Sequence, residues 1–321
     1  MEILLLEPTV KSTIWGGRQL IDDYGFKTDG DNAAEAWLLS CHKDGASFVV
    51  NGSFAGQSLQ QVLASQGKEL LGTNAAHLSD FPVLIKLIDA KDRLSVQVHP
   101  DDAYAMAHEH ENGKTEAWYI INAVPGAQLI YGVNHDMTKA EFAACIENGT
   151  LLSNVNTVEV KAGDTVFIPS GTLHAIGAGI LLAEVQQSSN TTYRVFDYMR
   201  RDKNGRLREL HTQKAVDVVN LSAVKPDFSA AGEKIKCGAA VKQTLCSCGY
   251  FTMTAVTLSG EYTDFADKKS FVSLLALSGE GEIKADGVTY KLKKGSSAFI
   301  PAGLGEYTLS GEKLSVLETR I

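Results

Sequence analysis

Residues 161–171 read KAGDTVFIPSG, and residues 293–303 repeat this stretch as KKGSSAFIPAG. In each copy a turn at a glycine leads into a short apolar run, which ends at Phe-Ile-Pro, a small residue and a second glycine. Short apolar runs bounded by turn residues are typical of β-strands, and self-similarity along a chain indicates a repeated structural unit. The sequence therefore predicts two similar β-domains.

The rest of the chain also consists mostly of short apolar runs, bounded by Gly, Asn, Asp or Pro. A few helices are predicted between them from apolar spacing and capping residues, at residues 58–71, 101–111, 138–149 and 209–219. Residues 222–232 are small or carry Pro and Gly, which is typical of a linker. We therefore expect a mainly β fold, with a first domain at residues 1–222 that holds the helices and a second at residues 233–321.

Around the first copy, the sequence carries side chains that bind metal ions. Gln97 and His99 lie two apart in the run LSVQVHP, so in a strand they point to one face. Glu116 opens the next apolar run, and His174 follows the first copy of the repeat. Two imidazoles, a carboxylate and an amide oxygen suit a borderline divalent ion such as Zn²⁺, with one position left open. The second copy has Glu306 at the position of His174, so a metal site is expected in the first domain alone.

Simpler interpretations stand beside the metal site. Amides are weak zinc ligands, so Gln97 could instead orient substrate or water. Glu116 could be the ion-pair partner of Lys114, because residues two apart share a face in a strand. Residues 108–111, HEHE, are interpreted as the solvated end of a polar helix rather than as a second metal site.

The composition excludes some classes of protein. The chain has 321 residues, of which 44% are hydrophobic and 21% charged, as in an ordinary globular protein. A net charge of −8 argues against a non-specific nucleic-acid binder. The first residues lack the basic segment of a signal peptide, and no stretch approaches the about 20 apolar residues of a membrane helix. Five cysteines without a CxxC pair predict reduced thiols and a cytoplasmic location.

The strand that ends in Ile-Pro-x-Gly before a histidine resembles the second motif of the cupin superfamily, whose jelly-roll barrels are lined by the ligands. The wider motif set is similar to the type I mannose-6-phosphate isomerase family in its short bacterial form. The resemblance is strong over the first two-thirds of the chain and looser in the C-terminal copy. It is carried by IWGG (14–17), AEAW (34–37), SVQVHPD (95–101), GKTEAW (113–118), PSGTLHA (169–175) and NTTYRVFDY (190–198).

This resemblance implies a zinc enzyme that interconverts D-mannose 6-phosphate and D-fructose 6-phosphate. It implies one Zn²⁺ per chain, with Gln97, His99, Glu116 and His174 as ligands. Arg194 matches the active-site arginine of the family, and Ser95, Lys114 and Glu184 match positions that line the substrate pocket. Asn190, a further candidate for substrate binding, stands where the family pattern has an aspartate, and it lacks the charge that a proton-transfer role would use.

An aldose–ketose isomerase must move a proton between C2 and C1 of the sugar through an enediol. Lys86 and Lys114 are candidate partners for the phosphate of the substrate, since a lysine supplies a point charge. Arg194 could bind either the phosphate or the developing enediolate. Glu184 lies in an apolar run, where burial is expected to raise its pKa and suit it as the base. A water molecule at the metal is the rival for this role.

Two other functions fit a cupin barrel. An iron-dependent oxygenase usually has more imidazole ligands, and the Gln and nearby cationic side chains argue against it. A non-catalytic sugar-binding or regulatory cupin would fit the C-terminal copy, but Arg194 and Lys114 argue against it for the whole chain. The expected partner is a small sugar phosphate, with no nucleic acid and no membrane. The sequence allows either a monomer or a homodimer.

Overall fold

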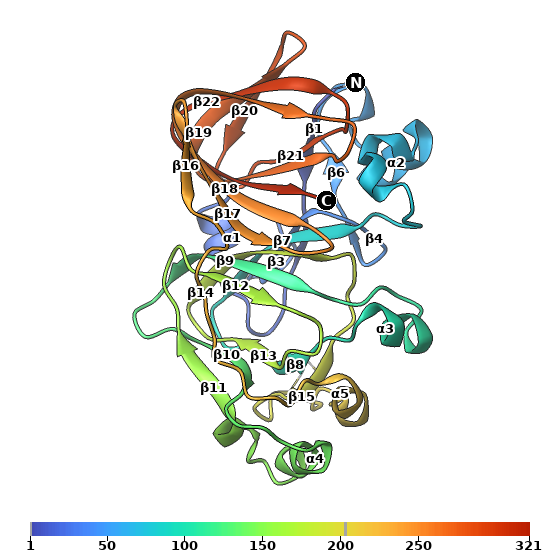
Figure 1. The fold of residues 1–321 in the computed structure, drawn as a ribbon, viewed down its shortest axis with the longest axis vertical. Helices are drawn as coiled ribbons and strands as arrows, with labels where there is room; N and C mark the ends of the chain where they lie inside the picture. The colour runs from blue at the N-terminus through green and yellow to red at the C-terminus, as the bar shows by residue number, and fades with distance from the viewer. Residues whose placement is uncertain (1, 202–203) are drawn as a thin grey trace.

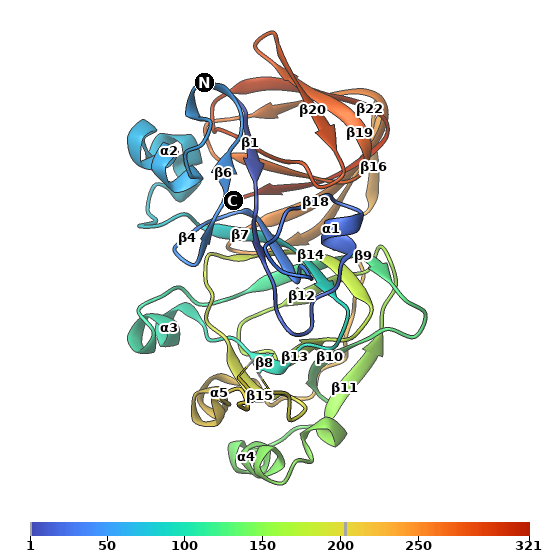
Figure 2. The same cartoon turned by 180° about the vertical axis from the view of Figure 1, so that it is seen from behind.

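The computed structural model describes residues 2–201 and 204–321, and within these ranges the strands form two barrels stacked along the long axis of the molecule (Figure 1). The barrel of the N-terminal part carries most of the helices, and that of the C-terminal part is formed by long strands. Viewed from behind, the N-terminal β1 (Leu4–Glu7) runs beside the C-terminal barrel (Figure 2). The prediction of a mainly β fold is therefore confirmed.

The first barrel consists of two facing sheets. One has the order β12-β9-β14-β7-β3-β2 and the other the order β11-β10-β13-β8-β15. The strands of the first sheet are β2 (Thr9–Lys11), β3 (Glu35–Leu39), β7 (Val83–Ala90), β9 (Glu116–Ala123), β12 (Thr165–Ile168) and β14 (Ile180–Gln187). Those of the second are β8 (Val96–Val98), β10 (Gln128–Val133), β11 (Val155–Glu159), β13 (His174–Ile176) and β15 (Tyr193–Phe196).

The second barrel is formed by one sheet, with the order β16-β17-β18-β22-β19-β21-β1-β6 and β20 beside β19. Its C-terminal strands are β16 (Lys234–Cys237), β17 (Ala240–Ser247), β18 (Thr252–Ala266), β19 (Val272–Ala285), β20 (Val288–Lys293), β21 (Ser297–Ile300) and β22 (Gly305–Arg320). The strands β1 and β6 (Phe48–Val49) come from the N-terminal end of the chain and extend this sheet. The predicted domain boundary between residues 222 and 233 stays a prediction. Strands β1 and β6 precede this boundary in the sequence, but they belong to the sheet of the second barrel.

The repeat in the sequence is a repeat in the structure. Strand β12 occupies the same four positions of the first copy that β21 occupies in the second. The glycines that precede them, Gly163 and Gly295, have φ of 94° and 84°. These are left-handed values that favour glycine, so both copies need glycine at the turn into the strand.

Two of the predicted helices begin where their capping residues predict. Ser58 and Thr138 form capping boxes at α2 (Leu59–Gln66) and α4 (Lys139–Glu147). The predicted helix 58–71 is too long, because Gly67 ends α2 and a 3-10 turn, η2 (Lys68–Leu71), follows. The remaining α-helices are α1 (Gln19–Asp22), α3 (Asp102–His108) and α5 (Thr212–Val218), and the other short elements are η1 (Gly52–Phe54), η3 (Thr73–Ala75), η4 (Leu151–Asn154), β4 (Cys41–His42) and β5 (Gly45–Ala46). The start predicted for α5 is three residues early.

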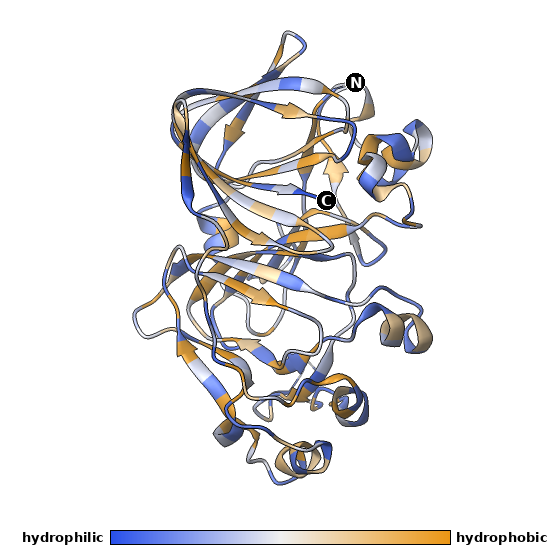
Figure 3. Ribbon diagram, in the orientation of Figure 1, coloured by the Kyte–Doolittle hydropathy of each residue, from blue (hydrophilic) through white to orange (hydrophobic). Residues whose placement is uncertain are grey.

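The two barrels share an apolar interface. Phe81 of the first part stacks on Phe271 of the second, with ring centroids 5.5 Å apart, and Phe299 lies beside both. Strand β7 runs along this interface, is buried at every position and is mostly apolar in Figure 3. A continuous apolar run is what a strand covered on both faces requires. The interface therefore holds in place the sheet of the first barrel that contains β7. Several polar side chains of the candidate site lie on this sheet.

Candidate active site

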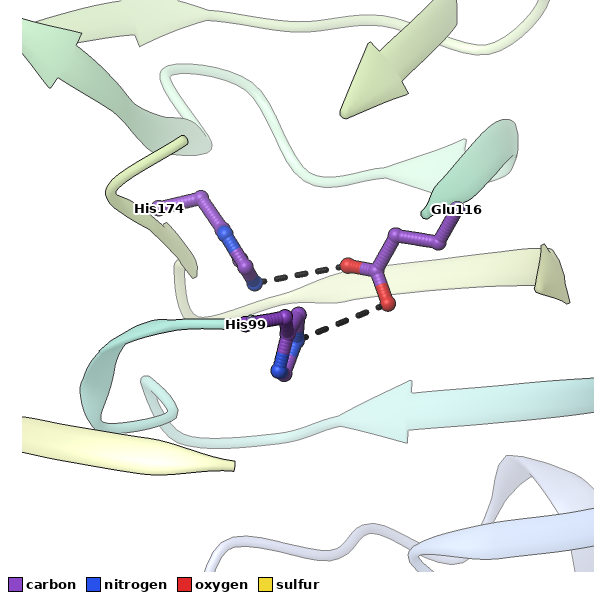
Figure 4. Close-up of side chains that lie close together, drawn as sticks. All are labelled: His99, Glu116 and His174. Carbon is purple, nitrogen blue, oxygen red and sulfur yellow. Dashed lines mark ion pairs between the residues drawn. The ribbon is translucent and has the colours of Figure 1, made fainter. Parts of the chain in front are cut away.

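Three of the predicted metal ligands converge inside the first barrel (Figure 4). The carboxylate of Glu116 points between the two imidazoles, with Oε1 at 3.3 Å from His174 Nε2 and Oε2 at 3.6 Å from His99 Nε2. One potential ligand atom from each residue lies within 4.8 Å of the others, and all three side chains are buried. The prediction that these three residues meet is therefore confirmed.

Strand register explains why they meet. In the sheet that contains β8, Gln97 pairs with His174 of β13 on one side and with Arg194 of β15 on the other. Directly paired residues in antiparallel strands point to the same face. Gln97 therefore lies between His174 and Arg194, and its amide Nε2 is 3.4 Å from His174 Nε2. The place of Gln97 beside the cluster agrees with either predicted role, ligand or orienting group.

The hydrogen bonds of the imidazoles prepare them to bind a cation. Nδ1 of His99 lies 2.9 Å from the carbonyl oxygen of Thr191, and Nδ1 of His174 lies 2.8 Å from that of Thr172. A carbonyl can only accept, so each ring carries its proton on Nδ1 and turns the lone pair of Nε2 toward Glu116. Among the described residues, His99 Nε2 and Glu116 Oε1 have no hydrogen-bond partner although both are buried. Two imidazole lone pairs and a carboxylate facing one point fit a divalent cation such as zinc.

Electrostatics favour the same state for the two imidazoles. Burial lowers the pKa of His174 to about 4, and burial with nearby Lys114 lowers the pKa of His99 well below its usual value. Both imidazoles are therefore neutral near pH 7, which is the form that binds metals. Burial, followed by repulsion from Glu184, raises the pKa of Glu116, and Lys114 opposes this rise.

A second group of charged side chains stands beside the cluster, on or next to the sheet that also carries Glu116. Lys114 Nζ lies 2.8 Å from Glu116 Oε2, so the ion pair considered as an alternative role for Glu116 is present. Lys86 Nζ lies 3.1 Å from Glu184 Oε1 and 3.7 Å from Glu35 Oε2. Lys86, Lys114 and Glu184 are all buried. Two lysines thus lie next to the metal-type cluster.

The expectation that burial raises the pKa of Glu184 is wrong in its net effect. Burial alone does raise that pKa, but Lys114 and Lys86 together outweigh it, and hydrogen bonds from Lys86 and Trp118 add to their effect. The net direction is downward. Glu184 is therefore ionised near neutral pH, but its lowered pKa makes it a weaker base than the raised pKa expected from the sequence would.

Arg194 and Ser95, two further predicted site residues, lie in contact. Arg194 Nε donates to Ser95 Oγ over 3.3 Å, and Nη1 donates to the carbonyl of Glu209 over 2.9 Å. Asn190 is different, because its side chain is exposed and its amide donates to Asp44 over 2.9 Å. Asn190 therefore lies at the surface beside Asp44, whereas the other predicted residues are buried or half-buried.

Some polar groups of this site have no predicted role from the sequence. Trp118 Nε1 donates to Glu184 Oε2 over 2.9 Å, and Trp37 Nε1 donates to Glu35 Oε2 over 2.6 Å. Gln186 pairs in register with Glu116, is fully buried, and donates to the carbonyls of Gln187 and Ser189. The sequence could have pointed to Glu35 and Gln186 as site residues, because each is a polar residue in an apolar run that forms a strand.

The second barrel carries different side chains at the equivalent positions. Glu116 pairs with Ile168 of β12, and the corresponding residue of β21, Ile300, pairs with Val272. An apolar side chain thus replaces the carboxylate. Glu306, at the repeat position of His174, is exposed. These replacements agree with the expectation that the C-terminal copy lacks a metal site.

We expect Glu306→Ala to leave turnover near the wild-type value, because its side chain faces solvent on the second barrel. Steady-state assays of the two proteins side by side measure this, and exposed substitutions of this kind change stability by about 0.5 kcal/mol or less. A large fall in turnover would show that the second barrel takes part in the reaction.

Comparisons with known proteins agree with this geometry. The family model "phosphomannose isomerase type I, catalytic domain" matches residues 3–119, and "mannose-6-phosphate isomerase, cupin domain" matches residues 241–318. The chain is 40% identical over 311 residues to mannose-6-phosphate isomerase ManA of Bacillus subtilis (strain 168), covering 97% of this chain and 96% of the relative. It is 38% identical over 311 residues to mannose-6-phosphate isomerase of Streptococcus mutans, with the same shares covered.

Solved structures agree as well. The mannose 6-phosphate isomerase of Bacillus subtilis superposes with a TM-score of 0.92 at 35% identity, over 100% of both chains. A putative mannosephosphate isomerase of Archaeoglobus fulgidus has the same fold, with a TM-score of 0.77 at 23% identity, over 99% of this chain and 96% of that chain. The predicted cupin fold is thereby confirmed. In residues 2–201 and 204–321, no helix has the length and apolar character needed to span a membrane.

Proposed function

The chain is an enzyme of the type I mannose-6-phosphate isomerase family, and we propose that it interconverts D-mannose 6-phosphate and D-fructose 6-phosphate with the help of one zinc ion. His99, Glu116 and His174 would hold the ion, with Gln97 beside them as fourth ligand. The observation that carries this proposal is the buried cluster itself. The Nε2 atoms of His99 and His174 face the carboxylate of Glu116. Neither Nε2 carries a proton, because each ring donates its proton from Nδ1 to a carbonyl.

A divalent ion at this point would supply a Lewis acid that stabilises negative charge on the C1 and C2 oxygens of the open-chain sugar. The protein contributes the rest of the site. Lys86 and Lys114 offset the negative charge of Glu184 and Glu116, so the positive charge of a bound ion would remain available to an anionic substrate. Arg194 is held in one orientation by Ser95 and the Glu209 carbonyl, and its guanidinium is suited to a phosphate or an enediolate.

We assign the proton transfer between C2 and C1 to Glu184. Its carboxylate is buried beside Lys86 and ionised, so it can take the proton from one carbon. The same group, now protonated, returns the proton to the other carbon, while the hydroxyl proton moves from the C2 oxygen to the C1 oxygen, so that the aldose becomes the ketose without another reactant. Trp118 fixes the orientation of this carboxylate through the hydrogen bond to Oε2.

We also propose a cytoplasmic location for the enzyme. Its five cysteines are all unpaired within the described part of the chain. Unpaired thiols of this number are typical of a reducing compartment.

The test of the proposed function is turnover of mannose 6-phosphate before and after removal of metal. We expect a protein purified without added metal to contain about one zinc per chain, to lose its activity after dialysis against a chelator, and to regain it when zinc is added back. Metal analysis and a coupled assay for fructose 6-phosphate measure this. Full activity in the metal-free protein would contradict the proposal, and oxygen uptake with iron in place of zinc would favour an oxygenase.

A further inference from the structure

The sequence run HEHE at residues 108–111 is only in part the solvated face that its polar composition predicts, because His108 and His110 are exposed whereas the two glutamates are partly buried. Helix α3 ends at His108, and His110 has a left-handed φ of 55°. The side chains of Glu109 and Glu111, on either side of His110, are only 25% and 20% exposed. Both carboxylates reach the segment 190–194, which precedes and enters strand β15. This segment carries the carbonyl of Thr191 and the side chain of Arg194.

Glu111 holds the turn that contains Thr191. Its Oε1 accepts a hydrogen bond from the backbone N–H of Asn190 over 3.2 Å, and its Oε2 accepts one from Thr191 Oγ1 over 3.0 Å. These two bonds hold the main-chain nitrogen of Asn190 and the side chain of Thr191, which lie on either side of the peptide bond between these residues. The position of the Thr191 carbonyl is therefore tied to the position of Glu111.

His42 in turn holds Glu111. The backbone N–H of Asp44 donates to His42 Nδ1 over 3.1 Å, so the proton of the neutral ring lies on Nε2. That nitrogen donates to Glu111 Oε1 over 2.5 Å. The imidazole of His42 is buried, whereas Glu111 lies at the edge of the barrel. A residue 69 positions away in sequence thus orients this carboxylate.

The chain of contacts ends at a proposed metal ligand. The carbonyl of Thr191 accepts from His99 Nδ1 over 2.9 Å, and this contact keeps the proton off Nε2. Partners that orient a ligating histidine contribute strongly to metal affinity. The carbonyl cannot be removed by a side-chain substitution, so its position depends on the groups that hold the turn.

We propose that His42 and Glu111 are positioning residues of the metal site, which act on His99 through the Thr191 carbonyl. They fix the tautomer and orientation of the His99 ring and so strengthen the binding of the ion. This inference rests on the proposed function in so far as the ion is zinc. The clamp itself, formed by His42, Glu111 and Thr191, is a property of the protein without metal.

The variants that test it change the clamp without touching a ligand. Glu111→Ala removes all three contacts of the carboxylate, and Thr191→Val removes the hydroxyl while it keeps the shape of the side chain. Glu111→Gln keeps the reach of the side chain, with an oxygen for the Asn190 N–H and His42 and an amide for Thr191 Oγ1. The matched control is Glu109→Ala, because Glu109 is similarly exposed on the same helix end but binds Tyr193 Oη and Lys214 Nζ, each over 2.7 Å.

The first measurement is zinc affinity, by competition with a chromophoric chelator. We expect Glu111→Ala to weaken zinc binding by about tenfold and Thr191→Val by about threefold, at the low end of the range for groups that orient a ligand. Glu111→Gln should stay within about threefold of the wild type and Glu109→Ala within about twofold, since neither breaks the chain of contacts to His99. Unchanged affinity in Glu111→Ala, or equal weakening in Glu109→Ala, would overturn the inference.

The second measurement needs no metal. Nitrogen-15 spectra of the histidine side chains in the zinc-free protein report which ring nitrogen carries the proton. We expect the His99 proton on Nδ1 in the wild type and Glu111→Gln, and shared between the two nitrogens in Glu111→Ala. An unchanged His99 tautomer in Glu111→Ala would overturn the inference. A wild-type protein that binds no zinc would instead contradict the proposed function. The tautomer of His99 in the zinc-free variants would still show whether Glu111 and His42 orient that ring.

Discussion

His174→Ala is expected to lose the bound zinc and nearly all turnover of mannose 6-phosphate while the barrel stays folded. The imidazole supplies one of the two nitrogen atoms that face Glu116. Its removal leaves a site with one imidazole nitrogen, one carboxylate and the Gln97 amide, which is a weak ligand. Loss of a mere orienting partner costs about 10–100-fold in metal affinity or activity, so loss of a ligand should lower turnover by about three orders of magnitude or more. Strand β13 keeps its main-chain pairing with β8 and β10.

Metal analysis, a coupled assay and a thermal unfolding curve of the same sample measure this result. The control is His135→Ala, since His135 is an exposed imidazole that lies against Asn134. It should keep both zinc and activity. A His174→Ala protein with one tightly bound zinc per chain would remove His174 from the ligand set.

The second large effect is expected for Arg194→Ala, which should lower turnover by about two to three orders of magnitude, the scale of one positioned charge in a closed site. Arg194 pairs in register with Gln97, and Ser95 and the Glu209 carbonyl hold its guanidinium. The effect should appear mainly in kcat, because a fixed cation stabilises charge that develops during the reaction.

Separate values of kcat and KM for Arg194→Ala test this role. Arg201→Ala is the control, since Arg201 is exposed and donates to the carbonyl of Gly205 in its own loop. It should leave both constants close to those of the wild type. A rise confined to KM in Arg194→Ala would assign Arg194 to binding of the phosphate, equally in substrate and transition state.

Local sequence patterns are sufficient to predict the core of the site. Residues two apart in a strand share a face, so the spacing of Gln97 and His99 alone assigns both side chains to one side of the sheet. The repeat places β12 and β21 at equivalent positions, and with them the histidine that follows the first copy. These features depend on residues close to one another in the chain.

What the sequence could not predict depends on distant partners. The pKa of Glu184 moves downward because Lys86 and Lys114 approach it from other parts of the chain, and no pattern around Glu184 reveals them. The polar neighbours of Glu111 predict a solvated residue, whereas His42 reaches it from a different part of the fold. The pairing of β1 with β21 joins the two ends of the chain and leaves no local signal.

The most direct test is an anomalous difference map at the zinc edge, from a crystal of the protein purified without added metal. We predict a peak inside the first barrel, about 2.0–2.2 Å from His99 Nε2, His174 Nε2 and a carboxylate oxygen of Glu116, with the Gln97 amide beside it. Turnover by such crystals with no peak between these side chains, or with a peak elsewhere in the molecule, would contradict a zinc centre at this place.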